Sequence, residues 1–185
     1  MSEKSVYFNK PQRLTQFIGV NTTGIVAGRK TEKTVSIAAP FVLRNMERMP
    51  GSTGDTDDTT FKHGLTNTIL GFLAAWKRWG FIEGIHYVVG KKPPKSCRQP
   101  IFDPKDYEHV ITFYNGYVAV IIYQDRTGSS NSLTLSWLID DEAEFIDYAK
   151  LKYETLPANS GMKSYLGIHS YNHSIMILSD MRSSQ

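Results

Sequence analysis

The chain has 185 residues, of which 41% are hydrophobic and 21% are charged. Aromatic and branched aliphatic residues recur along its whole length, so the composition excludes wholesale disorder and predicts one folded domain with its own core. The single cysteine, Cys97, excludes an internal disulfide and a zinc site made of cysteines alone. The polar start and the lack of a long uninterrupted apolar stretch predict no signal peptide and no membrane span, so we expect a soluble, intracellular protein.

The net charge of +3 conceals an asymmetry along the chain. Residues 1–104 carry 15 Lys and Arg against 8 Asp and Glu, whereas residues 105–185 carry 6 against 10. A basic half suits phosphate or nucleic acid, and an acidic half suits a divalent metal. Two ordinary solvated surfaces would give the same counts, so charge alone leaves both interpretations open.

The hydrophobic pattern predicts an α/β fold. In chain order we expect a strand at residues 17–27, a helix at 35–49 that Pro40 should kink or delay, a loop at 50–60, a helix at 61–79, a strand at 85–89, a loop at 90–104, strands at 109–114 and 117–123, a strand at 133–139, a helix at 143–153 and a strand at 174–178. Asn115 and Gly116 suit a tight hairpin turn. We interpret Asp55, Asp57 and Asp58 of the first loop as helix caps. Interleaved strands and helices predict a sheet with an antiparallel hairpin added.

Residues 27–34 form the segment with the clearest chemistry, and they read Ala-Gly-Arg-Lys-Thr-Glu-Lys-Thr. A Walker A phosphate loop needs this position between a strand and a helix, because loop amides and helix N-terminal amides must point at phosphates. In such a loop Gly28, Lys33 and Thr34 would bind the nucleotide, Thr34 would also bind Mg²⁺, and Arg29 would reach a phosphate in the transition state. Glu32 stands where a glycine is expected and crowds the phosphate. A degenerate phosphate loop and a chance basic loop therefore both remain open.

Residues 133–142 resemble a Walker B element, because an apolar strand ends in Asp140, Asp141 and Glu142. Ligands sit at the carboxyl ends of the strands in open α/β sheets. Asp141 would hold the magnesium ion, and Glu142 would orient and deprotonate the attacking water. Acidic residues also favour a helix N-terminus, and both interpretations can hold at once.

Taken in order, these segments resemble the ATPase domain of the large terminase subunit of tailed bacteriophages. The resemblance runs from about residue 7 to residue 181 and uses residues 8–13 before the first strand, the loop at 27–34, the hairpin and loop at 113–131, the acidic strand end at 139–143 and a strand end at 177–181. It implies a P-loop NTPase core with a mostly parallel sheet, an antiparallel hairpin and helices on both faces. It also implies ATP hydrolysis with Mg²⁺, coupled to packaging of double-stranded DNA.

The resemblance assigns further roles and partners. Gln12 would read adenine, Arg29 would serve as an arginine finger, and Ser179 would couple hydrolysis to movement. The implied partners are double-stranded DNA, the small terminase subunit and the portal protein, with the motor assembled as a homo-oligomeric ring and no membrane involved. The implied location is the cytoplasm of the infected bacterial host, at the procapsid.

Three features depart from this family or stay outside it. Glu32 puts ATP binding in question, and residues 1–185 are expected to form a single ATPase-like domain without the family's C-terminal nuclease domain. The alternatives are a truncated or decayed remnant that binds DNA or motor partners without catalysis, and an unrelated α/β interaction protein. The basic loop with Lys91, Lys92, Lys95 and Arg98 would either contact DNA phosphates or remain solvated.

Overall fold

The computed structural model describes residues 7–18, 21–28, 30–58, 68–123 and 133–181. The α-helices are α1 (Lys10–Phe17), α2 (Ala39–Arg48), α4 (Ile69–Arg78), α5 (Tyr148–Lys150), α6 (Leu156–Ala158) and α7 (Lys163–Leu166). The strands are β1 (Thr22–Ala27), β2 (Thr53–Asp58), β3 (Tyr87–Val89), β4 (Val110–Phe113), β5 (Val118–Tyr123), β6 (Trp137–Asp141) and β7 (Ser174–Asp180). Two π-helical turns, η1 (Thr34–Ala38) and η4 (Leu151–Thr155), and one 3₁₀ turn, η3 (Ala143–Phe145), complete the described elements.

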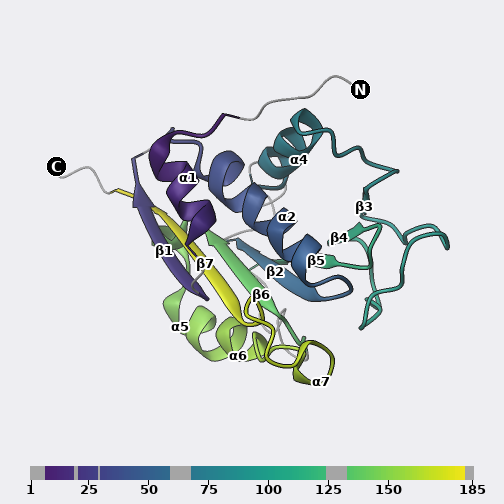
Figure 1. Ribbon diagram of the computed structural model, residues 1–185. Coiled ribbons are helices and arrows are strands. Elements are labelled where there is room, and N and C mark those ends of the chain that lie inside the picture. The colour runs from purple at the N-terminus through teal and green to yellow at the C-terminus, as the bar shows by residue number, and fades with distance from the viewer. Residues whose placement is uncertain (1–6, 19–20, 29, 59–67, 124–132, 182–185) are drawn as a thin grey trace.

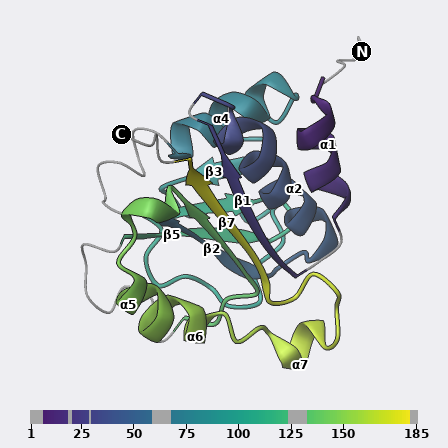
Figure 2. The ribbon, with the colours of Figure 1, turned by 90° about the vertical axis from the view of Figure 1, so that its left-hand side faces the viewer.

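All seven strands form one sheet, in the order β1-β7-β6-β2-β5-β4-β3. Neighbours from β1 to β5 are parallel, whereas β4 runs antiparallel to both β5 and β3. Helices α1, α2 and α4 lie on one face of the sheet, and α5 and α6 lie on the other (Figure 1). Figure 2 shows β1 at the edge of the sheet. The predicted architecture is therefore confirmed: a mostly parallel sheet, an antiparallel hairpin and helices on both faces.

The main core lies between the sheet and helices α2 and α4, and aromatic rings fill it. Trp137 on β6 stacks on Tyr117, with ring centroids 5.4 Å apart and planes 5° apart. Gly54 on β2 lies directly beneath the Trp137 ring, because a Cβ atom added there would be 1.8 Å from Cε2 of that ring. Glycine at this position therefore lets the tryptophan lie flat against the central strand.

The predicted loop at residues 50–60 is wrong, because Thr53–Asp58 forms β2 in the middle of the sheet, between β5 and β6. Asp55 is fully buried there, and its Oδ1 accepts a hydrogen bond from the backbone N–H of Ile122 at 3.2 Å. These acids therefore belong to a central strand, and the helix start that they were expected to cap lies outside the described residues. Polar side chains were a poor guide here because a buried carboxylate can be satisfied by hydrogen bonds.

Helix α1 was not predicted, and the strand expected from residue 17 begins only at Thr22. The helix starts with a capping box: Gln12 N–H donates to Asn9 Oδ1 at 2.9 Å, and Asn9 N–H donates to Gln12 Oε1 at 3.0 Å. Pro11 lies in the first turn, where a missing N–H is tolerated. No side chain of α1 is buried, so no apolar period revealed the helix.

The helix predicted at residues 35–49 is present, and Pro40 delays its α-helical part. The first turn, Thr34–Ala38, is π-helical, and the α-helix begins at Ala39 with Pro40 in its opening turn. The ring therefore removes no hydrogen bond from the interior of α2.

The helix predicted at residues 143–153 is wrong at both ends. The 3₁₀ turn η3 is followed by extended backbone at Ile146, and a new helical run begins after Asp147 and continues to Ala158. The Asp147 carboxylate caps this run by accepting hydrogen bonds from the backbone N–H groups of Ala149 and Lys150.

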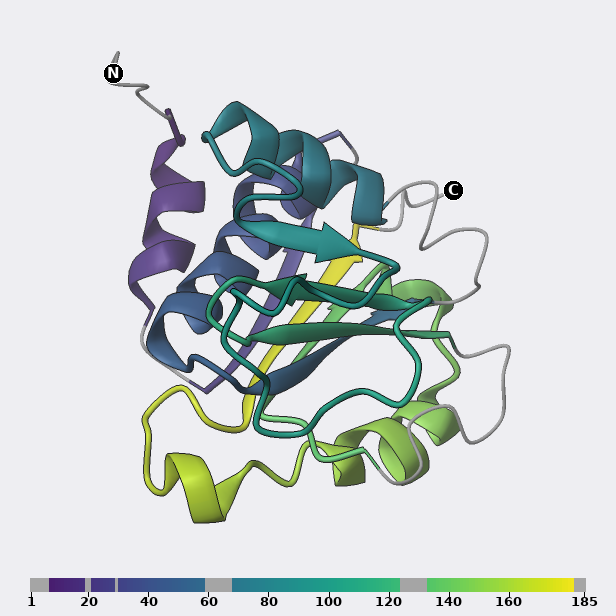
Figure 3. The same cartoon turned by 90° about the vertical axis from the view of Figure 1, so that its right-hand side faces the viewer.

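The antiparallel end of the sheet agrees with the expected hairpin. Gly116 has a positive φ of 80°, and its N–H donates to the carbonyl of Phe113 at 2.9 Å to close the turn. The connection from β3 to β4 is long and irregular, and it loops past this end of the sheet (Figure 3). In the part of the chain that the structure describes, no helix is long and apolar enough to cross a bilayer.

Candidate functional site

The candidate phosphate loop follows β1 directly and leads into η1 and α2. Thr31 Oγ1 donates to the carbonyl of Gly28 at 2.8 Å, which closes the loop on itself. Gln12 reaches the same loop from α1, where its Nε2 lies 3.4 Å from the Thr31 carbonyl. Arg29, the predicted arginine finger, lies outside the described residues. The loop therefore has the strand-to-helix position that a phosphate site requires.

The Lys33 side chain connects the loop to the carboxyl end of β7. Its side chain is only 9% exposed, and its Nζ forms an ion pair with Oδ1 of Asp180, the last residue of β7. Because β7 is the hydrogen-bonded neighbour of β1, the loop and this carboxylate meet at the same edge of the sheet. The predicted phosphate-binding lysine is thus held inside the site by an acid that the sequence interpretation did not assign.

Thr34 and Asp141 make the second link between the loop and the sheet. Thr34 Oγ1 donates to Oδ2 of Asp141 at 2.6 Å, and Asp141 is 3% exposed at the end of β6. Mg²⁺ prefers hydroxyl, carboxylate and phosphate oxygens, and this pair supplies the first two kinds side by side. The residues present therefore fit a magnesium ion. The sequence predicted both residues as Mg²⁺ ligands, although they lie 107 positions apart in the chain.

Glu142 follows Asp141 immediately and has left-handed backbone geometry, with φ 69° and ψ 45°. Such a conformation is uncommon for a residue other than glycine and is concentrated at functional sites. It ends β6 abruptly and starts the η3 turn beside the strand end. Glu142 is half-buried, so its side chain has some access to solvent.

Glu144, in the η3 turn, is a site residue that the sequence interpretation missed. Its Oε2 accepts the Ser179 hydroxyl at 2.9 Å and the Asp180 backbone N–H at 3.0 Å. Partial burial raises the pKa of the Glu144 carboxyl, but these hydrogen bonds outweigh that effect, and the net shift is downward. Ser179, the predicted coupling residue, therefore contacts the acidic turn that follows the Walker B-like strand.

Glu32 occupies the position that departs from the phosphate-loop pattern, and the backbone shows the consequence. Its φ is 57°, the region that a glycine adopts without strain, and Lys30 two residues earlier has φ 62°. The Glu32 carboxylate lies 3.5 Å from the hydroxyl of Ser36, in the η1 turn that follows the loop. The chain therefore keeps a glycine-like loop shape without the glycine.

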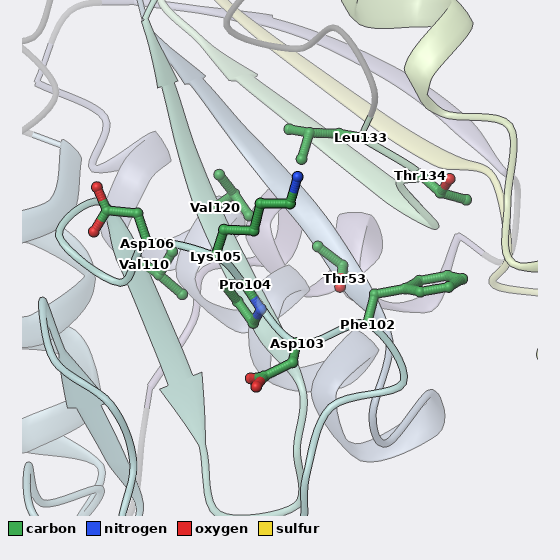
Figure 4. Close-up of a pocket in the computed structure, with 10 residues that line it drawn as sticks. All are labelled: Thr53, Phe102, Asp103, Pro104, Lys105, Asp106, Val110, Val120, Leu133 and Thr134. Atoms are coloured by element: carbon green, nitrogen blue, oxygen red, sulfur yellow. The ribbon is translucent and has the colours of Figure 1, made fainter.

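A separate cavity of about 480 Å³ lies toward the amino-terminal end of β2, on the face that α6 covers. Figure 4 shows its lining residues, with the Lys105 side chain extending toward Leu133. The lining residues are Thr53, Phe102, Asp103, Pro104, Lys105, Asp106, Val110, Val120, Leu133 and Thr134. None of them is a predicted site residue. Ligands of open α/β sheets bind at the carboxyl ends of the strands, so the cluster around Lys33 is the stronger candidate.

The structure resembles solved large terminases of bacteriophages. The large terminase ATPase domain of Thermus phage P74-26 has a TM-score of 0.62 at 13% identity, over 97% of this chain and 67% of that one. The large terminase of another bacteriophage, a thermophilic one, has a TM-score of 0.62 at 13% identity, over 95% of this chain and 39% of that one. The same thermophilic phage protein in complex with ADP gives 0.60 at 14% identity, over 94% and 38%.

No protein-family model and no curated protein matches the chain. The similarity therefore lies in the backbone, since 13% identity carries little residue-level information. The chain spans about two thirds of the isolated P74-26 domain and less than two fifths of the large terminase from the thermophilic bacteriophage. The described structure has the fold of the ATPase domain of phage large terminases.

Proposed function

We propose that this chain is an ATPase domain of the phage large terminase type, which binds ATP with Mg²⁺ at the carboxyl ends of β1, β6 and β7. One observation carries the proposal: consecutive residues of the loop, Lys33 and Thr34, meet the carboxylates of Asp180 and Asp141 at two different strand ends. The ADP complex of a protein with this fold supports a nucleotide as the ligand.

The proposed roles follow from charge and position. Lys33 would neutralise the β- and γ-phosphates, and amides of the loop near Gly28 would donate to them. Gln12 sits on α1 beside the loop and would face adenine. Mg²⁺, when bound, would offset the phosphate charge, and Thr34 and Asp141 would hold it.

Glu142 is the proposed general base for hydrolysis. Its carboxylate would take a proton from water as the water oxygen forms a bond to the γ-phosphorus. The bond from that phosphorus to the bridging oxygen breaks, so ADP and inorganic phosphate leave. Lys33 and Arg29 would stabilise the charge that develops on the transferred group, and Ser179, near the end of β7, would couple hydrolysis to movement.

We further propose that hydrolysis serves packaging of double-stranded DNA. In that role the partners would be DNA, the small terminase subunit and the portal protein, with several copies arranged in a ring in the infected cell's cytoplasm, at the procapsid. The exposed cations Lys91, Lys95 and Arg98 on the β3–β4 connection are candidates for DNA phosphate contacts. Residues 1–185 would act as one ATPase-like domain.

A second function is favoured by the Glu32 backbone: a non-catalytic domain of the same fold that binds DNA or motor partners. A left-handed glutamate strains the loop, and its carboxylate adds negative charge beside the phosphate site. Loss of the glycine would thus weaken nucleotide binding while leaving the sheet intact.

Nucleotide binding tests the first function. Titration of the purified protein with Mg²⁺-ATP in a calorimeter should give saturable binding that Lys33→Ala abolishes, because the variant lacks the buried ammonium. Lys163→Ala, which removes an exposed lysine on α7, is the matched control and should bind like the parent chain. Absence of binding by the parent chain at millimolar nucleotide would refute the ATPase proposal.

The Glu32→Gly variant separates the two functions. If the variant hydrolyses ATP and the parent chain does not, the domain is a remnant whose defect lies in the loop. If the parent chain hydrolyses ATP in a way that Glu142→Gln prevents, the remnant proposal fails. Thermal unfolding of each variant shows that any difference is not a difference in folding.

A further inference from the structure

Asp180 already pairs with Lys33, the lysine that the proposed function assigns to phosphate. The nearly buried Lys33 ammonium pairs with the Asp180 carboxylate, and Asp180 is 19% exposed. A phosphate that bound Lys33 would place more negative charge beside Asp180 and Asp141, at a site shielded from solvent. Phosphate and the Asp180 carboxylate therefore compete for the same lysine.

The competing carboxylate is also tied to the turn that follows the proposed base. Glu144 Oε2 accepts hydrogen bonds from the Ser179 hydroxyl and from the Asp180 backbone N–H. Glu144 lies two residues after Glu142, in the single turn η3. One carboxylate oxygen thus joins the end of β7 to the turn that carries Glu142.

Both contacts favour an ionised Glu144, since a protonated carboxyl would accept them more weakly. The lowered pKa of this carboxyl agrees with that charge state. A movement of Asp180 would change two hydrogen bonds that hold η3. The left-handed backbone of Glu142, at the start of the turn, is the place where such a movement would be absorbed.

We propose that Asp180 and Glu144 are positioning residues that orient Glu142 according to what Lys33 binds. While Lys33 pairs with Asp180, the end of β7 holds η3 through the hydrogen bonds of Ser179 and Asp180 to Glu144. When a phosphate takes Lys33, Asp180 loses its ion pair with that lysine, and Glu144 transmits the shift of β7 to the Glu142 turn. This inference rests on the proposed nucleotide binding and adds the residues that connect binding to the base.

The test compares Asp180→Asn and Glu144→Gln with the parent chain. Asp180→Asn removes the competing charge and should tighten nucleotide binding by about five-fold or more, within the usual range of coupling between sites. Glu144→Gln keeps its size but not its charge, so the nucleotide dissociation constant should stay within about two-fold while kcat falls about ten-fold. Asp147→Asn is the matched control, because it removes a nearby carboxylate yet keeps a helix-capping oxygen.

Hydrogen–deuterium exchange gives a readout besides activity. Nucleotide should change exchange across residues 142–146 of the parent chain and should leave it unchanged in Glu144→Gln. Thermal unfolding identifies any variant that merely fails to fold, and Glu144→Asp, which keeps the charge, should restore part of the nucleotide response.

The outcomes separate this inference from the proposed function. If the parent chain binds nucleotide and Asp180→Asn binds no more tightly, or if Glu144→Gln keeps the exchange response, the inference is overturned and the function stands. If Asp180→Asn alone binds nucleotide, the competition is supported and the parent chain is not an active ATPase. If neither the parent chain nor Asp180→Asn binds nucleotide, the proposed function and this inference both fail.

Discussion

Gly54 offers a sharp test of how the core is built. In Gly54→Ala the new Cβ would lie 1.8 Å from Cε2 and 2.0 Å from Nε1 of Trp137, far inside contact distance. The ring has no free space to retreat into, because it is fully buried, stacked on Tyr117 and in edge contact with Phe41. Overpacking of this kind costs about 1–3 kcal/mol. For a domain of this size the melting temperature should fall by roughly 2–12 °C.

Gly24 provides the matched control, because it lies on β1 and a Cβ there would meet nothing within 4 Å. Gly24→Ala should keep or slightly raise the melting temperature, since alanine lowers the entropy of the unfolded chain. Calorimetry of both variants, with urea unfolding as a second measurement, gives the difference directly. Equal stability of Gly54→Ala and Gly24→Ala would refute the described packing, and so would failure of Trp137→Phe to rescue Gly54→Ala.

Three further predictions concern single side chains. Thr34→Val should weaken ATP binding in the presence of Mg²⁺ by about ten-fold and leave Mg²⁺-free binding unchanged, because it removes the hydroxyl that donates to Asp141. Calorimetric titration measures both affinities, and Thr34→Ser, which keeps the hydroxyl, should bind like the parent chain. Burial, and then the hydrogen bond and charge of Asp103, raise the pKa of Tyr107 to about 12, so stability should fall as pH rises from about 10 to about 12. Absorbance at the tyrosinate band should show Asp103→Asn shifting this titration downward. Asn9→Ala should destabilise α1 by about 1 kcal/mol, seen as faster amide exchange in Lys10–Phe17, whereas an unchanged rate would contradict the capping box.

The approach of Thr34 to Asp141 was predictable because the loop with Thr34 and the acidic pair with Asp141 each follow a strand. Parallel strands bring their carboxyl ends to one edge, so two loops distant in sequence meet there. The apolar run before Asp141 and the strand before the loop were both visible in the hydrophobic pattern. The sequence therefore predicted that the loop approaches Asp141, once the sheet was assumed to be parallel.

The parts that escaped prediction depend on partners that are distant in sequence. Asp55 lies in a buried strand because an amide of β5 hydrogen-bonds it, and nothing local in Thr53–Asp58 signals a strand. Glu144 and Asp180 gain their importance only from contact with each other and with Lys33. A pattern that reads one segment at a time has no access to such contacts.

The two left-handed glutamates, Glu32 in the loop and Glu142 after β6, differ in what they imply for tolerance of mutations. A library selected on folding alone should enrich glycine and asparagine at both positions, because both relieve the positive φ. A library selected on ATP turnover should give different residues at the two positions, with glycine favoured at position 32 and glutamate retained at position 142. The same backbone geometry would thus be a burden at one position and a requirement of the chemistry at the other.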